Sequence, residues 1–223
     1  MSRFDAVLFD LDGTLCRWVQ DTEAAYQTAF ERAGVTPFGE PSELWAALDG
    51  PPDPDDRIGY LGAGFARLAA RYGRSEVDPL ALADRFVDRI DDAQVEYRPG
   101  AEAAVERAAA TGGAGLLTNG PSSRQSTKVE ALGLADRLDA LVYAGDLPRR
   151  KPHAAPFEHA LEALEAPADR TLYVGDSLAY DVAGAHNAGL EVAWCRRDAD
   201  DDAGEYRPEY VVDSPSELLS VLG

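Results

Sequence analysis

The fold is decided by the stretch Phe4-Asp-Ala-Val-Leu-Phe-Asp-Leu-Asp-Gly-Thr-Leu15. An apolar run that is typical of a buried strand ends in two carboxylates, Asp10 and Asp12, which Gly13 and Thr14 follow at once. Residues two apart in an extended chain project to the same side, so both acids can face one point at the end of the strand. A glycine at that point lets the backbone approach a ligand closely.

The two neighbouring acids indicate one of two kinds of chemistry. Two carboxylates at one point repel each other unless a cation lies between them or one of them holds a proton. The pair therefore fits a hard metal ion with oxygen ligands, or a nucleophile beside an acid–base group. A plain strand followed by a polar turn stays open as the alternative, since Asp and Gly are ordinary turn residues.

Length and composition limit the number of domains and the expected location of the protein. With 223 residues, 45% of them apolar, the chain can bury the core of one domain with an insertion or of two small domains. No run is long and apolar enough to span a bilayer, and no signal-peptide layout is visible, so a cytoplasmic location is expected. Cys16 and Cys195 show no disulfide framework or metal spacing and are expected to be buried small apolar residues.

The charge balance is strongly acidic. The chain has 40 acidic and 21 basic residues, a net charge of −19, and its only lysines are Lys128 and Lys151. Such a surface repels nucleic acids and acidic membranes. Because its self-repulsion requires screening by salt, we expect a protein from a high-salt cytoplasm, such as that of a halophilic archaeon.

The pattern after the first strand divides into a helical block and an alternating block. Helical periodicity covers residues 22–33, 42–48, 55–72 and 79–93, with a breaker cluster at Gly50–Pro54, so residues 16–96 are expected to be all-helical. From Arg98 onward, short apolar strands at 113–117, 140–144, 171–174, 191–195 and 210–212 alternate with helices. This alternation predicts an α/β fold with a Rossmann-like, doubly wound parallel sheet.

The first strand must belong to that same sheet, because a lone strand is not stable. Residues 1–15 and 98–223 are therefore predicted to form the α/β core, and residues 16–97 an inserted all-helical domain. Ligands of parallel α/β sheets bind beyond the carboxyl ends of the strands. Polar clusters occur there at Asp10–Thr14, Thr118–Gly120 and Gly175–Asp181, and Lys151-Pro152 lies in a loop before a helix.

Together these four clusters resemble the haloacid dehalogenase (HAD) superfamily of aspartate-nucleophile phosphohydrolases, phosphatase type. Asp10-Leu-Asp-Gly-Thr14 looks like its first motif, Thr118 its second, Lys151 its third and Gly175-Asp-Ser-Leu-Ala-Tyr-Asp181 its fourth. The helical insertion directly after the first motif resembles the helical cap of subclass I. The match covers roughly residues 4–15 and 98–197.

The resemblance implies roles for the acids. Asp10 would attack phosphorus and become an aspartyl-phosphate. Asp12 would protonate the leaving oxygen and later take a proton from the hydrolytic water. Mg²⁺ would be held by Asp10, the backbone carbonyl of Asp12, and Asp176, and would neutralise the phosphoryl oxygens.

It also implies roles for the remaining motif residues. Thr118 and backbone N–H groups near Asn119 and Gly13 would bind the phosphoryl group. Lys151 would neutralise charge in the transition state. Asp181 would hold a metal-bound water or orient Lys151. The implied partner is a small phosphorylated metabolite, and the protein would be a monomer or a homodimer.

The second acid discriminates among the reactions of this superfamily. Its dehalogenases lack an acid at the position of Asp12, because halide needs no proton on leaving, so Asp12 favours phosphoryl transfer. The phosphonatase branch uses a cap lysine, and residues 16–104 contain none. A phosphoglucomutase-like mutase stays open, and so does the less expected alternative of a phospho-accepting signalling domain, which uses a similar acidic cluster.

Residues around the second motif resemble those of one branch of the superfamily. Thr118-Asn-Gly120, followed by Gln125, Lys128 and Gly133-Leu134, looks more like nucleotidases and N-acylneuraminate phosphatases than like phosphoglycolate phosphatases. Trp18 is expected to pack in the protein interior, although its position next to the first motif also lets it face the site.

Overall fold

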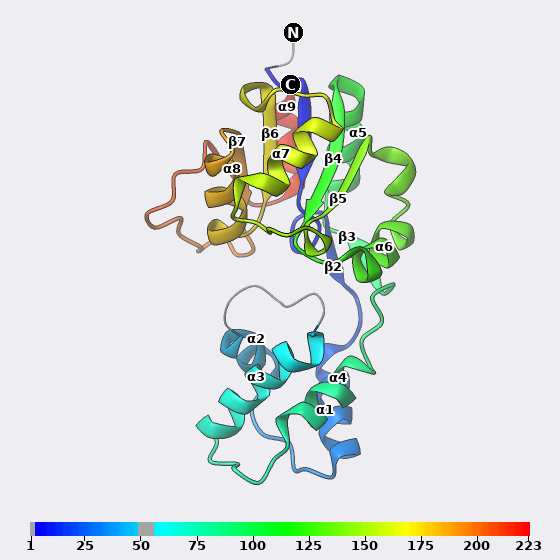
Figure 1. The fold of residues 1–223 in the computed structure, drawn as a ribbon, viewed down its shortest axis with the longest axis vertical. Helices are drawn as coiled ribbons and strands as arrows, with labels where there is room; N and C mark the ends of the chain where they lie inside the picture. The colour runs from blue at the N-terminus through cyan, green and yellow to red at the C-terminus, as the bar shows by residue number, and fades with distance from the viewer. Residues whose placement is uncertain (1–2, 49–55) are drawn as a thin grey trace. The chain divides into compact units, whose positions relative to one another are not determined.

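The structure, a computed structural model, describes residues 3–48 and 56–223 (Figure 1). The Gly50–Pro54 breaker cluster lies outside the described residues. The chain forms two compact units, Met1–Trp18 with Asp92–Gly223, and Val19–Asp91. Within the described residues, each helix is too short or too polar to cross a lipid bilayer.

The first unit is built on a six-stranded sheet in which every neighbouring pair of strands is parallel. In sheet order the strands are β5 (Ala140–Tyr143), β4 (Gly113–Thr118), β1 (Ala6–Phe9), β6 (Thr171–Gly175), β7 (Glu191–Cys195) and β8 (Tyr210–Val212). The first strand of the chain is therefore central, with β4 on one side and β6 on the other. The predicted parallel α/β fold is confirmed.

Helices cover both faces of this sheet (Figure 1). Val7 and Phe9 pack in one core with α5, α6 and α9, whereas Leu8 packs in a second core with α7 and α8. The alternation follows from the strand, whose successive side chains point to opposite faces. The helices are α5 (Ala101–Thr111), α6 (Ser122–Ala131), α7 (Ala154–Ala163), α8 (Ala183–Asn187), which a π-helical turn precedes at Leu178–Val182, and α9 (Leu218–Leu222). This is the predicted doubly wound arrangement.

A small second sheet corrects the expectation that residues 16–96 are all-helical. The strands β2 (Cys16–Trp18) and β3 (Val95–Tyr97) pair antiparallel. Cys16 is part of the buried core of the α/β unit, and Val95 and Tyr97 pack against that core. The helical unit therefore spans Val19–Asp91 rather than the predicted 16–97.

The second unit is a cluster of helices around aromatic side chains. Its helices are α1 (Thr22–Ala33), α2 (Pro41–Ala47), α3 (Arg57–Arg71) and α4 (Pro79–Val87). Tyr26, Phe30, Phe65 and Phe86 are fully buried at its centre, where their rings contact one another. Helix α1 begins at Thr22 because the Asp21 side chain accepts a hydrogen bond from Ala24 N.

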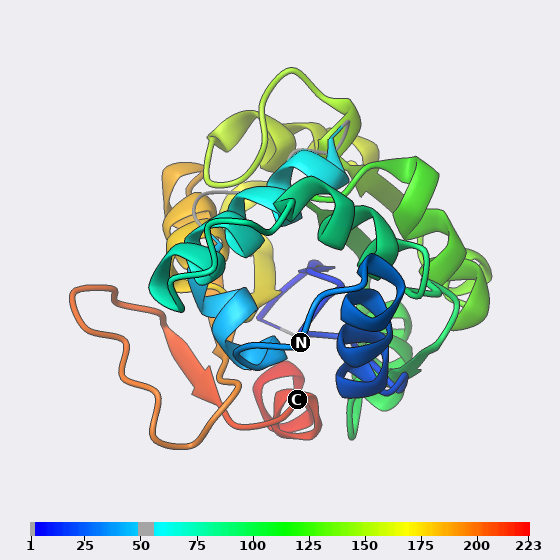
Figure 2. The same cartoon turned by 90° about the horizontal axis from the view of Figure 1, so that it is seen from below.

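Helix α4 ends earlier than the predicted residue 93. Beyond Val87, Arg89 N donates to Phe86 O and Ile90 N to Val87 O, so three-residue turns replace the helical bonds. Asp91 N then donates to the side chain of Gln20, which ties the two ends of the helical unit together. A long connection, residues 196–209, joins β7 to β8 without helix or strand (Figure 2).

Candidate active site

Three of the predicted clusters meet at one edge of the sheet. In the strand register Phe9 lies beside both Leu116 of β4 and Val174 of β6. Asp10, at the end of β1, therefore lies beside the ends of both neighbouring strands, where Thr118 and Asp176 are found. The central position of β1 in the sheet brings these motifs together.

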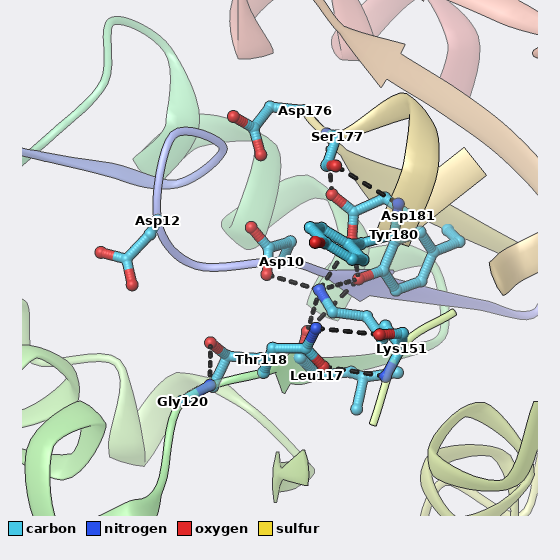
Figure 3. A network of polar contacts seen from close by, with 12 residues as sticks. Asp10, Asp12, Leu117, Thr118, Gly120, Lys151, Asp176, Ser177, Tyr180 and Asp181 are labelled. Atoms are coloured by element: carbon cyan, nitrogen blue, oxygen red, sulfur yellow. Dashed lines mark hydrogen bonds and ion pairs between the residues drawn. The ribbon is translucent and has the colours of Figure 1, made fainter. Parts of the chain in front are cut away.

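Lys151 is the centre of a buried polar network (Figure 3). Its Nζ donates to Asp10 Oδ1 at 2.7 Å, to Asp181 Oδ1 at 2.6 Å and to Tyr173 Oη at 2.9 Å. The Tyr173 hydroxyl also donates to Asp181 Oδ1 at 2.9 Å, and the Ser177 N–H donates to the other Asp181 oxygen at 2.9 Å. Lys151 is 3% exposed, so its charge is screened little by solvent.

Three buried carboxylates form an oxygen cluster beside this lysine. Asp10, Asp176 and Asp181 each offer an oxygen, and these oxygens lie within 4.8 Å of one another. An all-oxygen set of buried acids suits a hard divalent cation such as Mg²⁺. The side chain of Asp12 lies apart from this set, so Asp12 can join it only through its backbone carbonyl.

Burial and mutual repulsion shape the electrostatics of the cluster. Burial, with the charges of Asp181 and Asp176, raises the pKa of Asp10 well above its usual range, although the Lys151 ammonium opposes this. Burial likewise raises the pKa of Asp176. Burial acts to lower the pKa of Lys151, but the facing carboxylates of Asp10 and Asp181 outweigh it and raise that pKa. The excess of acids over cations in this volume fits a bound cation.

The loop of Gly13 comes close to the cluster because position 13 has no side chain. Gly13 has a φ of 82°, and a Cβ there would clash with Asp176 Oδ2. An alanine would therefore be strained and would also push Asp176 away. The Gly13 carbonyl accepts a hydrogen bond from the Arg98 guanidinium, which also donates to Arg196 O at 3.2 Å.

The second motif is connected to the third. Asn119 Nδ2 donates to the Lys151 carbonyl at 3.1 Å, and the Lys151 N–H donates to Asn119 Oδ1 at 2.8 Å. This pair of bonds fixes the backbone that carries the lysine. The Asn119 side chain is thus engaged with the Lys151 backbone, and the predicted phosphoryl contact stays with the Asn119 backbone N–H. Thr118 Oγ1 accepts from Gly120 N at 3.4 Å and from Gln125 Nε2 at 2.8 Å.

Asp12 points away from Asp10 (Figure 3) and contacts helix α6. Lys128 Nζ donates to its Oδ1 at 2.7 Å, and Gln125 Nε2 donates to its Oδ2 at 2.7 Å. Burial acts to raise the pKa of Asp12, but the charge of Lys128 and the hydrogen bonds from Gln125 and Lys128 outweigh it and lower that pKa. The two acids of the first motif therefore lie in different environments.

Four residues join the site that the motifs did not point to. They are Gln125, Lys128, Tyr173 and Arg197, whose guanidinium pairs with Asp176. For Gln125 and Lys128 a signal existed, since residues three apart share one face of a helix and a lysine is rarely buried without a partner. Tyr173 and Arg197 gave no such signal.

Comparisons with known proteins agree with this geometry. Residues 4–189 match the haloacid dehalogenase-like hydrolase family. The chain is 28% identical to the pyrimidine 5′-nucleotidase YjjG of Escherichia coli over 228 residues, which cover 99% of this chain and 98% of YjjG. It is 34% identical to the phosphoglycolate phosphatase of Cereibacter sphaeroides over 202 residues, which cover 84% of this chain and 83% of that enzyme.

A solved structure supports the same fold. The HAD hydrolase YfnB of Bacillus subtilis, whose structure was determined bound to magnesium, matches with a TM-score of 0.75 at 24% identity, over 99% of each chain. A sheet with this strand order, the buried acids at its edge and the match over residues 4–189 point to one conclusion. The chain belongs to the haloacid dehalogenase-like hydrolase family.

Proposed function

We propose that this protein is a phosphatase that hydrolyses a small phosphomonoester through an aspartyl-phosphate on Asp10. The observation that carries the proposal is the separation of the two acids of the first motif. Asp10 lies in the buried cluster with Lys151, whereas Asp12, two residues on, is held apart by Gln125 and Lys128. One acid is thus placed as a nucleophile and the other as an acid–base group.

The reaction then takes two steps. Before the first step Asp12 takes up a proton from solvent, because, against the effect of burial, Lys128 and Gln125 lower its pKa and hold it as a carboxylate. In that step an Asp10 oxygen attacks phosphorus, the bond from phosphorus to the ester oxygen breaks, and Asp12 gives this proton to the leaving oxygen. In the second, Asp12 takes a proton from water, the water oxygen attacks phosphorus, and the bond to Asp10 breaks to release phosphate. Asp12 returns to its starting protonation state, so protons balance over the cycle.

The surrounding residues hold the phosphoryl group during both steps. Thr118 Oγ and the N–H groups near Gly13 and Asn119 would donate to its oxygens. Lys151, fixed by Asp181 at 2.6 Å, would neutralise charge that spreads over those oxygens in the transition state. Asp10, Asp176 and the Asp12 carbonyl would hold Mg²⁺, which supplies further neutralisation of the phosphoryl charge.

Turnover of p-nitrophenyl phosphate tests the proposal. We expect steady release of nitrophenol that requires Mg²⁺, because three buried carboxylates cannot accept a phosphoryl group without a counter-cation. EDTA should abolish the activity and added Mg²⁺ should restore it. A phospho-accepting signalling domain would stop after a single turnover, and that result would reject the phosphatase. A panel of nucleoside monophosphates, sugar phosphates and phosphoglycolate, assayed in molar KCl, then ranks the substrates.

We also propose that the helical unit Val19–Asp91 acts as a cap that selects the leaving group. Its insertion lies between β1, which carries the nucleophile, and the rest of the sheet, so both of its chain connections leave from the site edge of the α/β unit. The resemblance of the second motif to nucleotidases, together with the nucleotidase relative, favours a nucleoside monophosphate or a sugar phosphate as the substrate.

Adaptation to high salt is a further part of this proposal. The net charge is −19, and both lysines are buried, with 1% exposure for Lys128 and 3% for Lys151, so every exposed basic side chain is an arginine or a histidine. We expect the melting temperature to rise between low salt and molar KCl, because the screening length falls from about 10 Å at 0.1 M to about 3 Å at 1 M. A flat or falling melting temperature would reject the adaptation. A parallel thermal melt in sucrose provides the control, because sucrose is excluded from the protein surface but does not screen charge.

A further inference from the structure

Lys128 makes an ion pair that the motifs do not explain. It lies on α6, 1% exposed, and its Nζ is 2.7 Å from Asp12 Oδ1. The same nitrogen lies 5.4 Å from the centre of the Trp18 ring, within the range of a cation–π contact. A buried lysine loses hydration and side-chain freedom, so its partner is the feature that keeps it in this position.

The ion pair of Lys128 differs from those of Lys151 in the exposure of its carboxylate. Lys151 pairs with two carboxylates that are themselves buried, Asp10 at 9% and Asp181 at 2% side-chain exposure. The side chain of Asp12 is 46% exposed, so water reaches part of it even though burial acts on its carboxylate. Lys128 is therefore not the sole source of solvation for this acid. What the lysine adds is a fixed position for the carboxylate.

Gln125 contacts the other oxygen of Asp12 and links this acid to the phosphoryl pocket, by which we mean Thr118 and the backbone near Gly13 and Asn119. It lies three residues before Lys128 on the same face of α6. Its Nε2 donates to Asp12 Oδ2 at 2.7 Å and to Thr118 Oγ1 at 2.8 Å. Each oxygen of Asp12 thus has its own donor, and one of these donors also touches the threonine of the second motif.

We propose that Lys128, together with Gln125, is a positioning residue that fixes the Asp12 carboxylate relative to the phosphoryl pocket for proton transfer to the leaving oxygen. The inference rests on the proposed function. Helix α6 carries both donors, so one rigid element sets the distance between the acid of the first motif and Thr118. Lys128 acts through Asp12 rather than on the phosphoryl group, because its polar contact is with Asp12 and not with Asp10 or Asp176.

The test compares phenyl phosphate with p-nitrophenyl phosphate, two esters of nearly equal shape. Phenolate is a strong base that needs a proton on leaving, whereas p-nitrophenolate is a weak base that does not. We expect Lys128→Met to lower kcat/KM for phenyl phosphate by about tenfold or more, as misplaced catalytic groups do, and to change kcat/KM for p-nitrophenyl phosphate much less. Both values are measured with saturating Mg²⁺.

The Asp12→Asn background decides whether the effect passes through Asp12. In that background Lys128→Met should add no further loss with phenyl phosphate. Arg137→Met is the control, since it removes a positive charge that pairs with Glu102 at 2.8 Å rather than with Asp12, and it should not separate the two esters.

Three results would overturn the inference. An equal loss with both esters would show that Lys128 contacts the phosphoryl group or supports the fold. A loss that persists in Asp12→Asn would show that it acts by another route. Lys128→Met with full activity toward phenyl phosphate would show that the pair has no role in proton transfer. Lack of turnover of either ester by the wild-type protein would instead reject the proposed function itself.

Discussion

Replacing Asp10 by Asn is expected to lower turnover by about ten-thousand-fold or more, the scale found when an enzyme loses its nucleophile. Asparagine has nearly the same shape, but its amide oxygen is a poor nucleophile toward phosphorus. The substitution also leaves Lys151 paired with Asp181 at 2.6 Å, so the network around the lysine keeps one of its two carboxylates. Steady-state hydrolysis of p-nitrophenyl phosphate with Mg²⁺ measures the loss.

Asp5→Asn is the control for this substitution. Asp5 precedes β1 at the other end of the strand and pairs with Arg170 on the surface. It should keep activity within about a factor of two, as surface changes distant from a site usually do. Full activity of Asp10→Asn would mean that another residue attacks phosphorus.

Replacing Lys151 by Met is expected to lower both activity and stability. The change leaves the buried carboxylates of Asp10 and Asp181 without their cation, and breaking a buried pair in this way costs about 3–5 kcal/mol. Turnover should fall by about a hundred-fold or more, because the transition state loses a preorganised charge. Urea unfolding in EDTA measures the stability, and hydrolysis with Mg²⁺ measures the activity.

Lys128→Met provides a matched comparison for stability. It removes the other lysine of the chain, whose partner Asp12 has a side chain that is half-exposed and that water can reach. It should therefore destabilise the protein less than Lys151→Met does, because only the more exposed of two carboxylates loses a cation. Equal stability of Lys151→Met and the wild-type protein would contradict the account of the buried network.

Much of the α/β unit could be predicted because its strands are short, apolar and bounded by glycine or polar residues. The run before Asp10 and the runs that end at Thr118 and Asp176 are of this kind, and the structure places them side by side as β1, β4 and β6. The pair of β2 and β3 could not be predicted in this way. Each strand has three residues, which is too short to show an alternation of apolar and polar residues. The two strands also lie far apart in the sequence, so no hairpin turn joins them.

The part of the site at the carboxyl ends of the strands could be predicted. The contacts made by α6 could not, because they depend on how that helix is rotated about its axis. Asp10, Asp176 and Asp181 lie in clusters at strand ends, where ligands of parallel sheets bind, and the structure brings them together. Lys151 lies in a loop before a helix, and only the family resemblance pointed to it. The contact between Asp12 and Lys128 depends instead on how α6 is rotated about its axis. Spacing shows that Gln125 and Lys128 share a face, but tertiary packing determines which group that face meets.

The distribution of the two lysines links the acidic composition to the site. In a chain of net charge −19, both lysines are placed inside the protein against carboxylates of the first motif. The exposed basic side chains are arginines and histidines, whereas each lysine places a compact ammonium group beside a carboxylate of the first motif.

Trapping of the covalent intermediate shows whether Asp10 is the nucleophile. The wild-type protein is mixed with radiolabelled p-nitrophenyl phosphate and Mg²⁺, quenched in acid, and digested for peptide mapping. We expect a label that hydroxylamine removes, as it does from acyl phosphates. The label should lie on the peptide that contains Asp10 and should be missing from Asp10→Asn. Turnover without a covalent label, or a label on another residue, would contradict this role of Asp10.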